Sequence, residues 1–438
     1  MLRRPRLIAL AVAAVMGSGA FAVWAGMPPS SDGPAPTGLA VASPTAAASQ
    51  STAPAASPSP PLPTGAPFVP SSIDRSGIVP RLQAALNAGR AELAAPGIVA
   101  SVLFPDGRQW TGVAGVADLA SGRALTPATP FAVASISKTF LAAEILLLVE
   151  EGHLALDDSV AALLPSTLVG GAAIDSRITI RMLLDHTSGL RDYLISPALD
   201  RAVRAEPTAI WTSEAVLAYA GRPVAPPGEG YNYANTNYVL LGLIAEDLTG
   251  RTLAAEFRDR FFEPLGFGSA SYQGLEAPVS QLPTSYRYSS GRLDAVPRDV
   301  TDGTDIRPFT AITTAAGAAG SVAASARDLA RWARALYGGY VLRPDLLAAM
   351  LADAEVTQKL DPPYPYGLGV QVFTIDGRVS YGHSGRLVGA RSAMRWFPEE
   401  GIAIAIVTNQ SRFDPTMVLR DLLAVVAPRH VVEPPWRD

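Results

Sequence analysis

The apolar runs that predict β-strands fall into two groups far apart in the chain, and this separation constrains the fold more than any other feature. The first group is a hairpin, 98–104 and 109–117, whose strands are joined by the turn-forming pair Asp106-Gly107. The second group lies near the other end and comprises the runs 367–374, 378–383, 390–397 and 402–408. We therefore expect one antiparallel sheet built from both ends of the domain.

Helical patterns occupy the stretch between the two strand groups, which shows no convincing sheet pattern. The expected helices are 179–185, 212–220, 237–248 and 252–262. Another begins at Ser325, where Asp328 completes a capping box. Further helices flank the sheet, from Pro80 to about 93 and from the N-cap Asp414 to about 426. These elements predict an α+β fold: an antiparallel sheet flanked by helices, an inserted all-helical lobe, and a cleft between lobe and sheet as the site.

The N-terminal part of the chain is expected to lie outside this core. Residues 1–26 read as a secretory signal peptide, with Arg3-Arg4 in a basic start and an apolar run before Ala22, or as an uncleaved N-terminal anchor. Residues 27–72 are rich in Pro, Ala, Ser and Thr, a composition typical of a disordered linker. The folded domain is expected over 73–430, with a short tail at 431–438. This order predicts an exported protein, secreted or tethered outside the cytoplasmic membrane, that meets a membrane only through an uncleaved N-terminal segment.

Composition excludes several functional classes. The chain has no cysteine, which rules out disulfides, thiol catalysis and zinc sites built on cysteine. Its net charge is only -4, with both signs dispersed, so neither a nucleic-acid groove nor a polybasic membrane patch is expected. The stability of the fold must therefore come from its apolar core, and the functional site must be built without cysteine and without a large basic surface.

Lysine is rare in this chain, and one of the two lysines stands in a chemically meaningful position. Of 35 basic residues, only Lys138 and Lys359 are lysine. Arginine stays protonated in proteins, whereas a buried lysine can lose its proton and act as a base. Ser135 and Lys138 are three residues apart at the start of an apolar helical pattern and share one face of that helix. The pair predicts a serine nucleophile with a lysine base; the alternative is an N-capping serine beside a solvated lysine.

A second candidate motif is Tyr233-Ala234-Asn235, which lies between the turn at 226–228 and a predicted helix. In an extended loop, side chains two residues apart can point into one cleft. Tyr233 could then relay a proton between Lys138 and the leaving group, and Asn235 could hold a substrate amide. The alternative is an N-capping asparagine beside ordinary aromatic packing.

A third candidate motif lies at the end of a predicted strand and reads Gly382-His383-Ser384-Gly385-Arg386. A glycine there lets a substrate backbone lie against the strand edge, with His383 facing the nucleophile and the Arg386 N–H serving as an oxyanion donor. The alternative is a simple turn. The remaining histidines are expected at helix ends: His153, His186 and His430.

The three motifs together resemble those of the penicillin-recognising serine hydrolases, the β-lactamase-related family of class C β-lactamases, D-alanyl-D-alanine carboxypeptidases and esterases. Their order matches: Ser-x-x-Lys at Ser135, Tyr-x-Asn at Tyr233 about 100 residues later, and His-x-Gly at His383 about 150 residues after that. The similarity covers about 80–426 and includes 183–190 and 366–369. It implies an acyl-enzyme on Ser135, a base role shared by Lys138 and Tyr233, and no metal or cofactor. It assigns substrate binding to Asn235, His383, Ser384, Gly385 and Arg386.

Two features narrow the activity that the resemblance implies. His383 stands where β-lactamases usually carry lysine, which favours peptide or ester hydrolysis over lactam destruction. Arg386 could pair with the carboxylate of a peptide ending in D-alanine, or could simply face solvent. The expected substrates are therefore small peptides, esters or β-lactams, with cell-wall peptidoglycan as one source of such peptides.

Two rival interpretations use the same residues. An α/β-hydrolase with Ser384 as nucleophile would need glycine where Arg386 stands, and no helix follows directly. A catalytically silent binder of wall peptides or β-lactams would use the same cleft, but the intact Ser135, Lys138 and Tyr233 argue against it. The sequence therefore predicts an exported serine hydrolase of the D-alanyl-D-alanine carboxypeptidase or esterase type, with β-lactamase and silent penicillin-binding protein as alternatives.

Overall fold

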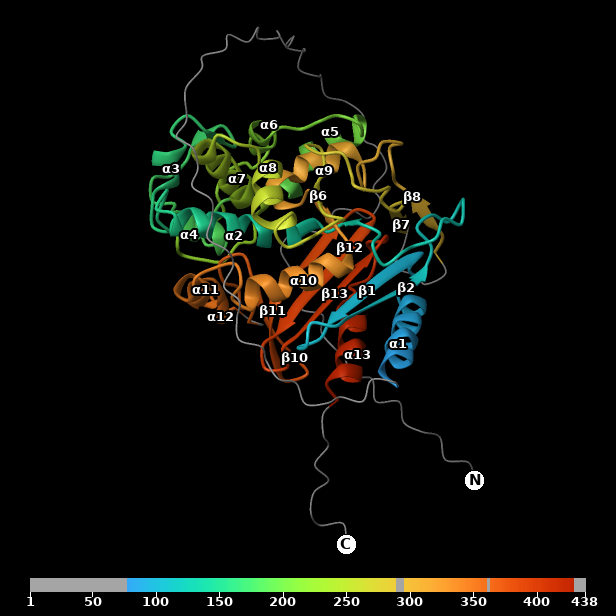
Figure 1. Cartoon of the computed structure of the whole chain (residues 1–438). Helices are drawn as coiled ribbons and strands as arrows, with labels where there is room; N and C mark the ends of the chain where they lie inside the picture. The colour runs from blue at the N-terminus through green and yellow to red at the C-terminus, as the bar shows by residue number, and fades with distance from the viewer. Residues whose placement is uncertain (1–76, 289–294, 361–362, 429–438) are drawn as a thin grey trace, which may run out of the picture.

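The computed structural model describes residues 77–288, 295–360 and 363–428 (Figure 1). The predicted signal peptide or anchor, the linker and the C-terminal tail lie outside the described residues. Within the described ranges, no helix has the length and apolar character needed to cross a membrane.

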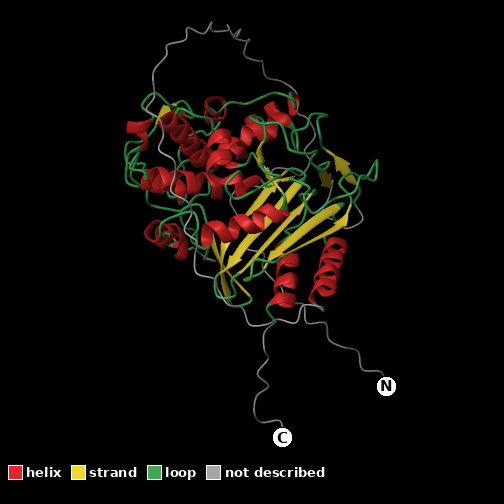
Figure 2. Ribbon diagram, viewed as in Figure 1, coloured by secondary structure: helices red, strands yellow, loops and turns green. Residues whose placement is uncertain are grey.

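The central element is an antiparallel sheet (Figure 2) whose six strands come from both ends of the chain, as predicted (Figure 1). In order across the sheet, its strands are β10 (Gln371–Ile375), β11 (Arg378–Leu387), β12 (Ala390–Phe397), β13 (Ile402–Thr408), β1 (Gly97–Leu103) and β2 (Gln109–Gly115). The C-terminal strand β13 pairs with the N-terminal strand β1, with Ile98 opposite Thr408. This pairing closes the domain, because it joins residues about 300 positions apart in the sequence.

The two faces of the sheet carry different layers. The N-terminal helix α1 (Ile78–Glu92) and the C-terminal helix α13 (Thr416–Val426) pack side by side on one face, over a cluster of apolar side chains from β1, β12 and β13 (Figure 1). Helix α10 (Ala326–Tyr337) crosses the opposite face. That second face also supports the helical lobe, and a larger apolar cluster fills the space between them. The site lies on this side, between sheet and lobe.

The helical lobe is confirmed. Its helices are α2 (Ser137–Glu150), α3 (Val160–Leu163), α4 (Ile180–Leu184), α5 (Pro197–Ala205), α6 (Ser213–Leu217), α7 (Asn235–Thr249), α8 (Leu253–Phe257) and α9 (Thr310–Ala316). Helices α4, α6 and α8 are shorter than the sequence suggests, whereas α7 is longer at both ends. The expected helix 252–262 changes at Arg258 to a π-helical turn. Two more helices, α11 (Pro344–Leu351) and α12 (Glu355–Gln358), follow α10.

Two sequence predictions about strands are wrong. The middle of the chain does contain sheet: β3 (Phe131–Ala132), β9 (Val322–Ala324) and β6 (Ser271–Tyr272) form three short strands, too brief to show a period of two. The strand expected from 367 starts only at Gln371. Gly369 has a φ of 78° and its N–H donates to the Leu184 carbonyl, so this segment turns away from the sheet to pack on α4.

Helix ends agree with their capping signals in part. The Ser325 hydroxyl accepts a hydrogen bond from the Asp328 N–H at 3.1 Å, the first half of the predicted capping box. The Asp328 carboxylate instead accepts from Ser269, whose hydroxyl bonds the Ser325 N–H. The last helix begins at Thr416 with Pro415 in the N-cap position, one residue later than predicted, and Asp414 accepts a hydrogen bond from the Thr416 N–H.

Glu144 is a buried carboxyl in α2 that makes the stability of the lobe depend on pH. It lies 3.4 Å from the guanidinium of Arg260, which is already bonded to Glu256 and Glu151. Burial raises the pKa of Glu144 to about 8. The folded state therefore holds a proton that the unfolded chain releases near pH 4.5, and stability falls as pH rises from there to about 8.

The variant Glu144→Gln replaces the titrating carboxyl by an uncharged amide of nearly the same shape. We expect its free energy of unfolding to exceed that of the wild type by about 1 kcal/mol or more at pH 8, and to match it near pH 5. Urea unfolding at both pH values measures the difference. Parallel pH curves for the two proteins would show that Arg260 keeps Glu144 ionised.

Candidate active site

Ser135 lies in a strained turn at the entrance to α2. The chain leaves β3 at Ala132 and forms a single 3-10 turn, Ala134–Ile136, before the α-helix starts at Ser137. Ala134 has a φ of 50°, in the left-handed region that residues other than glycine rarely occupy. The predicted helix start is thus two residues too early. The turn leaves Ser135 partly exposed while the residues on both sides are buried.

Lys138 is completely buried and donates hydrogen bonds to three acceptors. Its Nζ lies 3.2 Å from the Ser135 hydroxyl, 2.7 Å from Asn235 Oδ1 and 2.9 Å from the carbonyl oxygen of Ala319. Burial lowers the pKa of Lys138 to about 7, and the attraction of Asp192 opposes this shift. The alternative of a solvated lysine is therefore wrong, and a substantial neutral fraction exists at physiological pH.

Asn235 connects Lys138 to a buried carboxylate. It is the first residue of α7, where the sequence predicts a loop, and Ala234 occupies the N-cap position. Its Oδ1 accepts from Lys138, and its Nδ2 donates to Asp192 Oδ2 at 2.9 Å. The N-capping alternative is therefore wrong. The sequence predicts that the Asn235 amide holds a substrate amide, whereas in the structure it bridges Lys138 and Asp192.

Tyr233 lies next to both members of the Ser135 and Lys138 pair. Its side chain hydrogen-bonds that of Ser135, and its ring centroid is 5.0 Å from Lys138 Nζ. Burial keeps the pKa of Tyr233 well above its usual value, so the phenol stays protonated and can pass a proton on without resting as an anion. The structure thus brings the first two sequence motifs together around one hydroxyl.

His186 holds the segment that carries Tyr233. It ends α4 with a φ of 63°, in agreement with the predicted helix stop. Its Nδ1 accepts from the N–H of Ala234 at 3.2 Å and lies 3.0 Å from Asn237 Nδ2. Its ring centroid is 4.3 Å from that of Tyr233. Burial lowers the pKa of His186 well below its usual value, so it acts as a neutral hydrogen-bond acceptor.

His383 is neutral and oriented by two neighbours. Its Nδ1 lies 2.7 Å from the carbonyl oxygen of Ser384, which can only accept, so Nδ1 carries the proton. Its Nε2 then accepts from the Tyr366 hydroxyl at 3.0 Å. Burial lowers the pKa of His383 well below its usual value. The ring centroid lies 6.3 Å from that of Tyr233, so this part of β11 is close to the proton-transfer group.

The alternative of a simple turn at the third motif is wrong, because these residues form the last half of β11. Strand β10 pairs with β11 only as far as Gly382, so the edge of β11 beyond Gly382 is not covered by β10. Gly385 is buried against η2, the turn that carries Ser135, and a Cβ added to it would lie 2.1 Å from the carbonyl oxygen of Val133. The Ser384 N–H donates to Gln371 across this edge, and the alternation of a strand directs the Arg386 N–H to the same edge.

The side chains of Ser384 and Arg386 point away from the nucleophile. Ser384 lies opposite Ala393, and Arg386 opposite Arg391, on the face of the sheet that α1 and α13 cover. The Arg386 side chain is exposed, and Asp414 is its acidic neighbour. Its guanidinium group is therefore on the opposite face of the sheet from Ser135, and the predicted pairing of Arg386 with a substrate carboxylate is wrong. Only its backbone remains a candidate for contact with substrate.

Three residues of the site were not identified from the sequence: Asp192, His186 and Tyr366. The segments 183–190 and 366–369 contribute to the family resemblance, but the sequence pattern assigns no contact to their side chains. Asp192 could have been found from the sequence, because a buried lysine needs a nearby carboxylate and Asp192 is the acidic residue that follows Ser188-Gly189. Across the described ranges, no group of three or more His, Cys, Asp or Glu side chains is arranged to hold a metal ion.

The coupling of Lys138 to Asp192 predicts a pH profile. If Lys138 must be neutral to accept a proton, kcat/KM rises with pH around a pKa near 7. Asp192 raises the lysine pKa, so Asp192→Asn should lower it and move the acid limb down by about 1 pH unit. Asp185, whose pKa burial raises to about 6, is the other group that could titrate here. If the acid limb shifts in Asp185→Asn and stays in place in Asp192→Asn, the limb reports the titration of Asp185 and not that of Lys138.

The fold, together with Ser135 and the buried Lys138, defines the class as a serine hydrolase, and comparison with known proteins places it more narrowly. The family model described as Beta-lactamase matches residues 82–427. The chain belongs to the beta-lactamase family. It is similar to penicillin-binding protein 4 of Amycolatopsis lactamdurans, with 31% identity over 346 residues, 75% of this chain and 84% of that protein.

Other relatives are named for reactions at D-amino acids. A D-aminopeptidase of Brucella anthropi is 34% identical over 159 residues, which span 36% of this chain and 29% of that protein. The crystal structure of a D-stereospecific amidohydrolase from Streptomyces sp. matches 80% of this chain and 99% of that one, with a TM-score of 0.68 and 29% identity. A D-amino acid amidase of Ochrobactrum anthropi SV3, 22% identical with a TM-score of 0.67, shares the fold.

Proposed function

We propose that this protein hydrolyses amide or ester bonds of small D-amino acid compounds through an acyl-enzyme on Ser135, in the manner of a D-alanyl-D-alanine carboxypeptidase-like peptidase or esterase. The observation that carries the proposal is the buried Lys138 Nζ at 3.2 Å from the Ser135 hydroxyl, with a pKa near 7. Relatives named for penicillin binding and for D-aminopeptidase and D-amino acid amidase reactions support the substrate class.

The proposed reaction assigns one step to each group. Lys138 accepts the Ser135 proton as the oxygen attacks the carbonyl carbon, and the backbone N–H groups of Ser135 and Arg386 receive the developing oxyanion. Tyr233 donates its proton to the leaving group and regains one from Lys138. Asn235 and Asp192 hold the lysine in place throughout. Water then attacks the acyl-enzyme by the same proton path in reverse.

Neutral His383 favours this reaction over β-lactam destruction. β-Lactamases usually carry lysine at this position, whereas His383 is an uncharged imidazole with both nitrogens engaged. We propose that β-lactams acylate the protein more readily than they are turned over. Export, by the N-terminal segment 1–26, forms part of the same proposal and would place the enzyme where wall peptides occur.

The test uses two labels and a panel of substrates. A fluorescent penicillin and an active-site serine phosphonate are compared on wild type and Ser135→Ala, and D-alanine amide, D-alanyl-D-alanine and a D-alanyl ester are assayed alongside. We expect both labels and all turnover to require Ser135. Labelling that persists in Ser135→Ala would overturn the proposal, and acylation without turnover of any substrate would identify a silent binder.

A further inference from the structure

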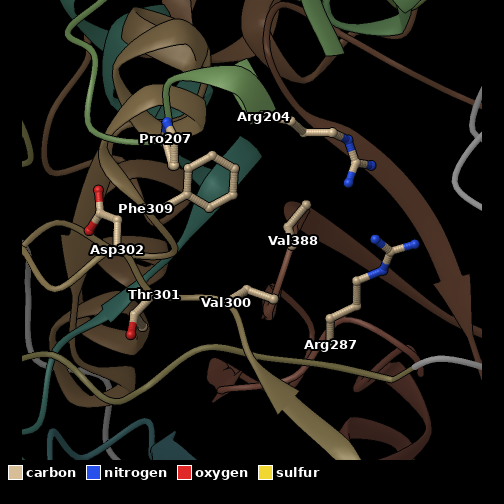
Figure 3. A pocket seen from close by; sticks show the side chains of 8 residues that line it. All are labelled: Arg204, Pro207, Arg287, Val300, Thr301, Asp302, Phe309 and Val388. Carbon is tan, nitrogen blue, oxygen red and sulfur yellow. The ribbon is translucent and has the colours of Figure 1, made fainter. Parts of the chain in front are cut away.

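A cavity of about 330 Å³ lies at the C-terminal end of β11, outside the group of residues described above (Figure 3). One part of its lining is apolar and includes Val300, Phe309 and Val388, whereas Arg204 and Arg287 line another part. Figure 3 shows both guanidinium groups on the same side of the cavity, across from the ring of Phe309. The cavity therefore combines an apolar wall with a cationic one.

The cavity is a continuation of the strand edge at the active site. Val388 directly follows Leu387, the last residue of β11. A Cβ added to Gly320 would lie 3.5 Å from Leu387 Cδ1 and 3.9 Å from the carbonyl carbon of Ala134, so Leu387 lies close to the turn that carries the nucleophile. At about 3.3 Å per strand residue, Val388 is roughly 10 Å beyond Gly385, where β11 touches that turn.

The direction of a bound substrate follows from the position of the proton donor. The leaving group must lie near Tyr233, which donates its proton in the proposed function on which this inference rests. Tyr233 is close to His383, at the opposite side of Gly385 from Leu387. The acyl part of a substrate aligned with β11 therefore runs the other way, past Leu387 and towards the cavity.

The cationic wall of the cavity offers guanidinium donors, and Asp302 lies in another part of the lining. Arg204 is held in place by Asp200, whose carboxylate lies 2.9 Å from the arginine Nε. Burial and the nearby charge of Arg204 lower the pKa of Arg287, and the Asp200 carboxylate opposes this shift, so the two guanidinium groups lie near each other and near Asp200. The acidic group of the lining, Asp302, accepts hydrogen bonds from Thr304 and from the Thr310 N–H. A planar carboxylate matches the fork of guanidinium donors, and an alkyl chain that carries it suits the apolar wall.

We propose that this cavity binds the acyl part of the substrate, and that Arg204 and Arg287 select acyl groups whose chain ends in a carboxylate. The apolar wall at Phe309 and Val388 would contact the chain, and the guanidinium groups its end. The enzyme would thus prefer an N-acylated D-amino acid compound with an anionic acyl group over its neutral counterpart.

The experiment compares two substrates that differ only in charge: glutaryl-D-alanyl-D-alanine and the same compound with the glutaryl carboxylate replaced by a carboxamide. We expect kcat/KM for the anionic compound to be about tenfold higher at low salt, mainly through a lower KM. Arg204→Gln and Arg287→Gln should each reduce this ratio, and the double variant should bring it to one. Arg287→Lys, which keeps the charge, should retain part of the preference.

Arg201→Gln is the matched control, because it removes the same charge from the same helix α5 without changing the lining of the cavity. It should leave the ratio at its wild-type value, and the thermal unfolding of every variant is followed to verify folding. Equal rates for the two substrates in the wild type, or a ratio that survives the double variant, would overturn the inference. Failure of the proposed function looks different, since no D-alanyl substrate would then depend on Ser135.

Discussion

Replacing Lys138 with methionine is expected to lower kcat by roughly 10³-fold or more while the protein stays folded. Lys138 is the basic group that the described residues place on the Ser135 hydroxyl, and the neutral His186 and His383 nearby have their acceptor nitrogens engaged elsewhere. Loss of a general base in such a site costs about 10² to 10⁴ in rate. Steady-state kinetics with the best substrate of the panel, together with circular dichroism, measures both expectations.

Two further variants separate chemistry from charge. Lys138→Arg keeps a cation but cannot release its proton, so it should be as inactive as the methionine variant. Lys359→Met is the matched control: this other lysine is exposed on the surface, where it pairs with Glu355. It should retain wild-type kinetics. Activity in Lys138→Arg close to that of the wild type would mean that the lysine serves only as a positive charge and that Tyr233 is the base.

The fold could be predicted to the extent that its signals are local. The hairpin at Asp106-Gly107 and the strands 390–397 and 402–408 have apolar runs and turn residues within a few positions of each other. Their arrangement in one sheet followed from the need to pair strands from both ends. The short strands β3, β6 and β9 could not be predicted, because two or three residues carry no periodic pattern and their pairing depends on the finished lobe.

The site shows the same division between local and distant signals. Ser135 and Lys138 are one helical turn apart, so their proximity was predictable from spacing alone. Asp192 meets Asn235 across 43 positions, and no spacing rule relates them. The wrong expectation for Arg386 has a related cause: a strand pattern gives alternation, but which face points to the nucleophile depends on the layers that cover the sheet.

Introducing a methyl group at Gly385 is expected to have the second large effect on activity. The added Cβ of Gly385→Ala would lie 2.1 Å from the carbonyl oxygen of Val133 and 2.2 Å from Ser392 Oγ. The Val133 contact is with backbone two residues before Ser135, so β11 and the nucleophile must move apart. Displacements of about 1 Å at a reacting group can cost on the order of 10² in rate, and we expect kcat/KM to fall by at least that factor.

The control for this substitution is Gly268→Ala, because a Cβ at Gly268 meets nothing within 4 Å and the backbone there does not need glycine. It should leave both kcat/KM and Tm unchanged. In Gly385→Ala, phosphonate labelling of Ser135 should slow less than turnover, since labelling needs the nucleophile while turnover also needs the strand edge that holds the substrate. Equal kinetics for Gly385→Ala and the wild type would show that β11 yields without disturbing Ser135, and that the strand edge does not set the geometry of acyl transfer.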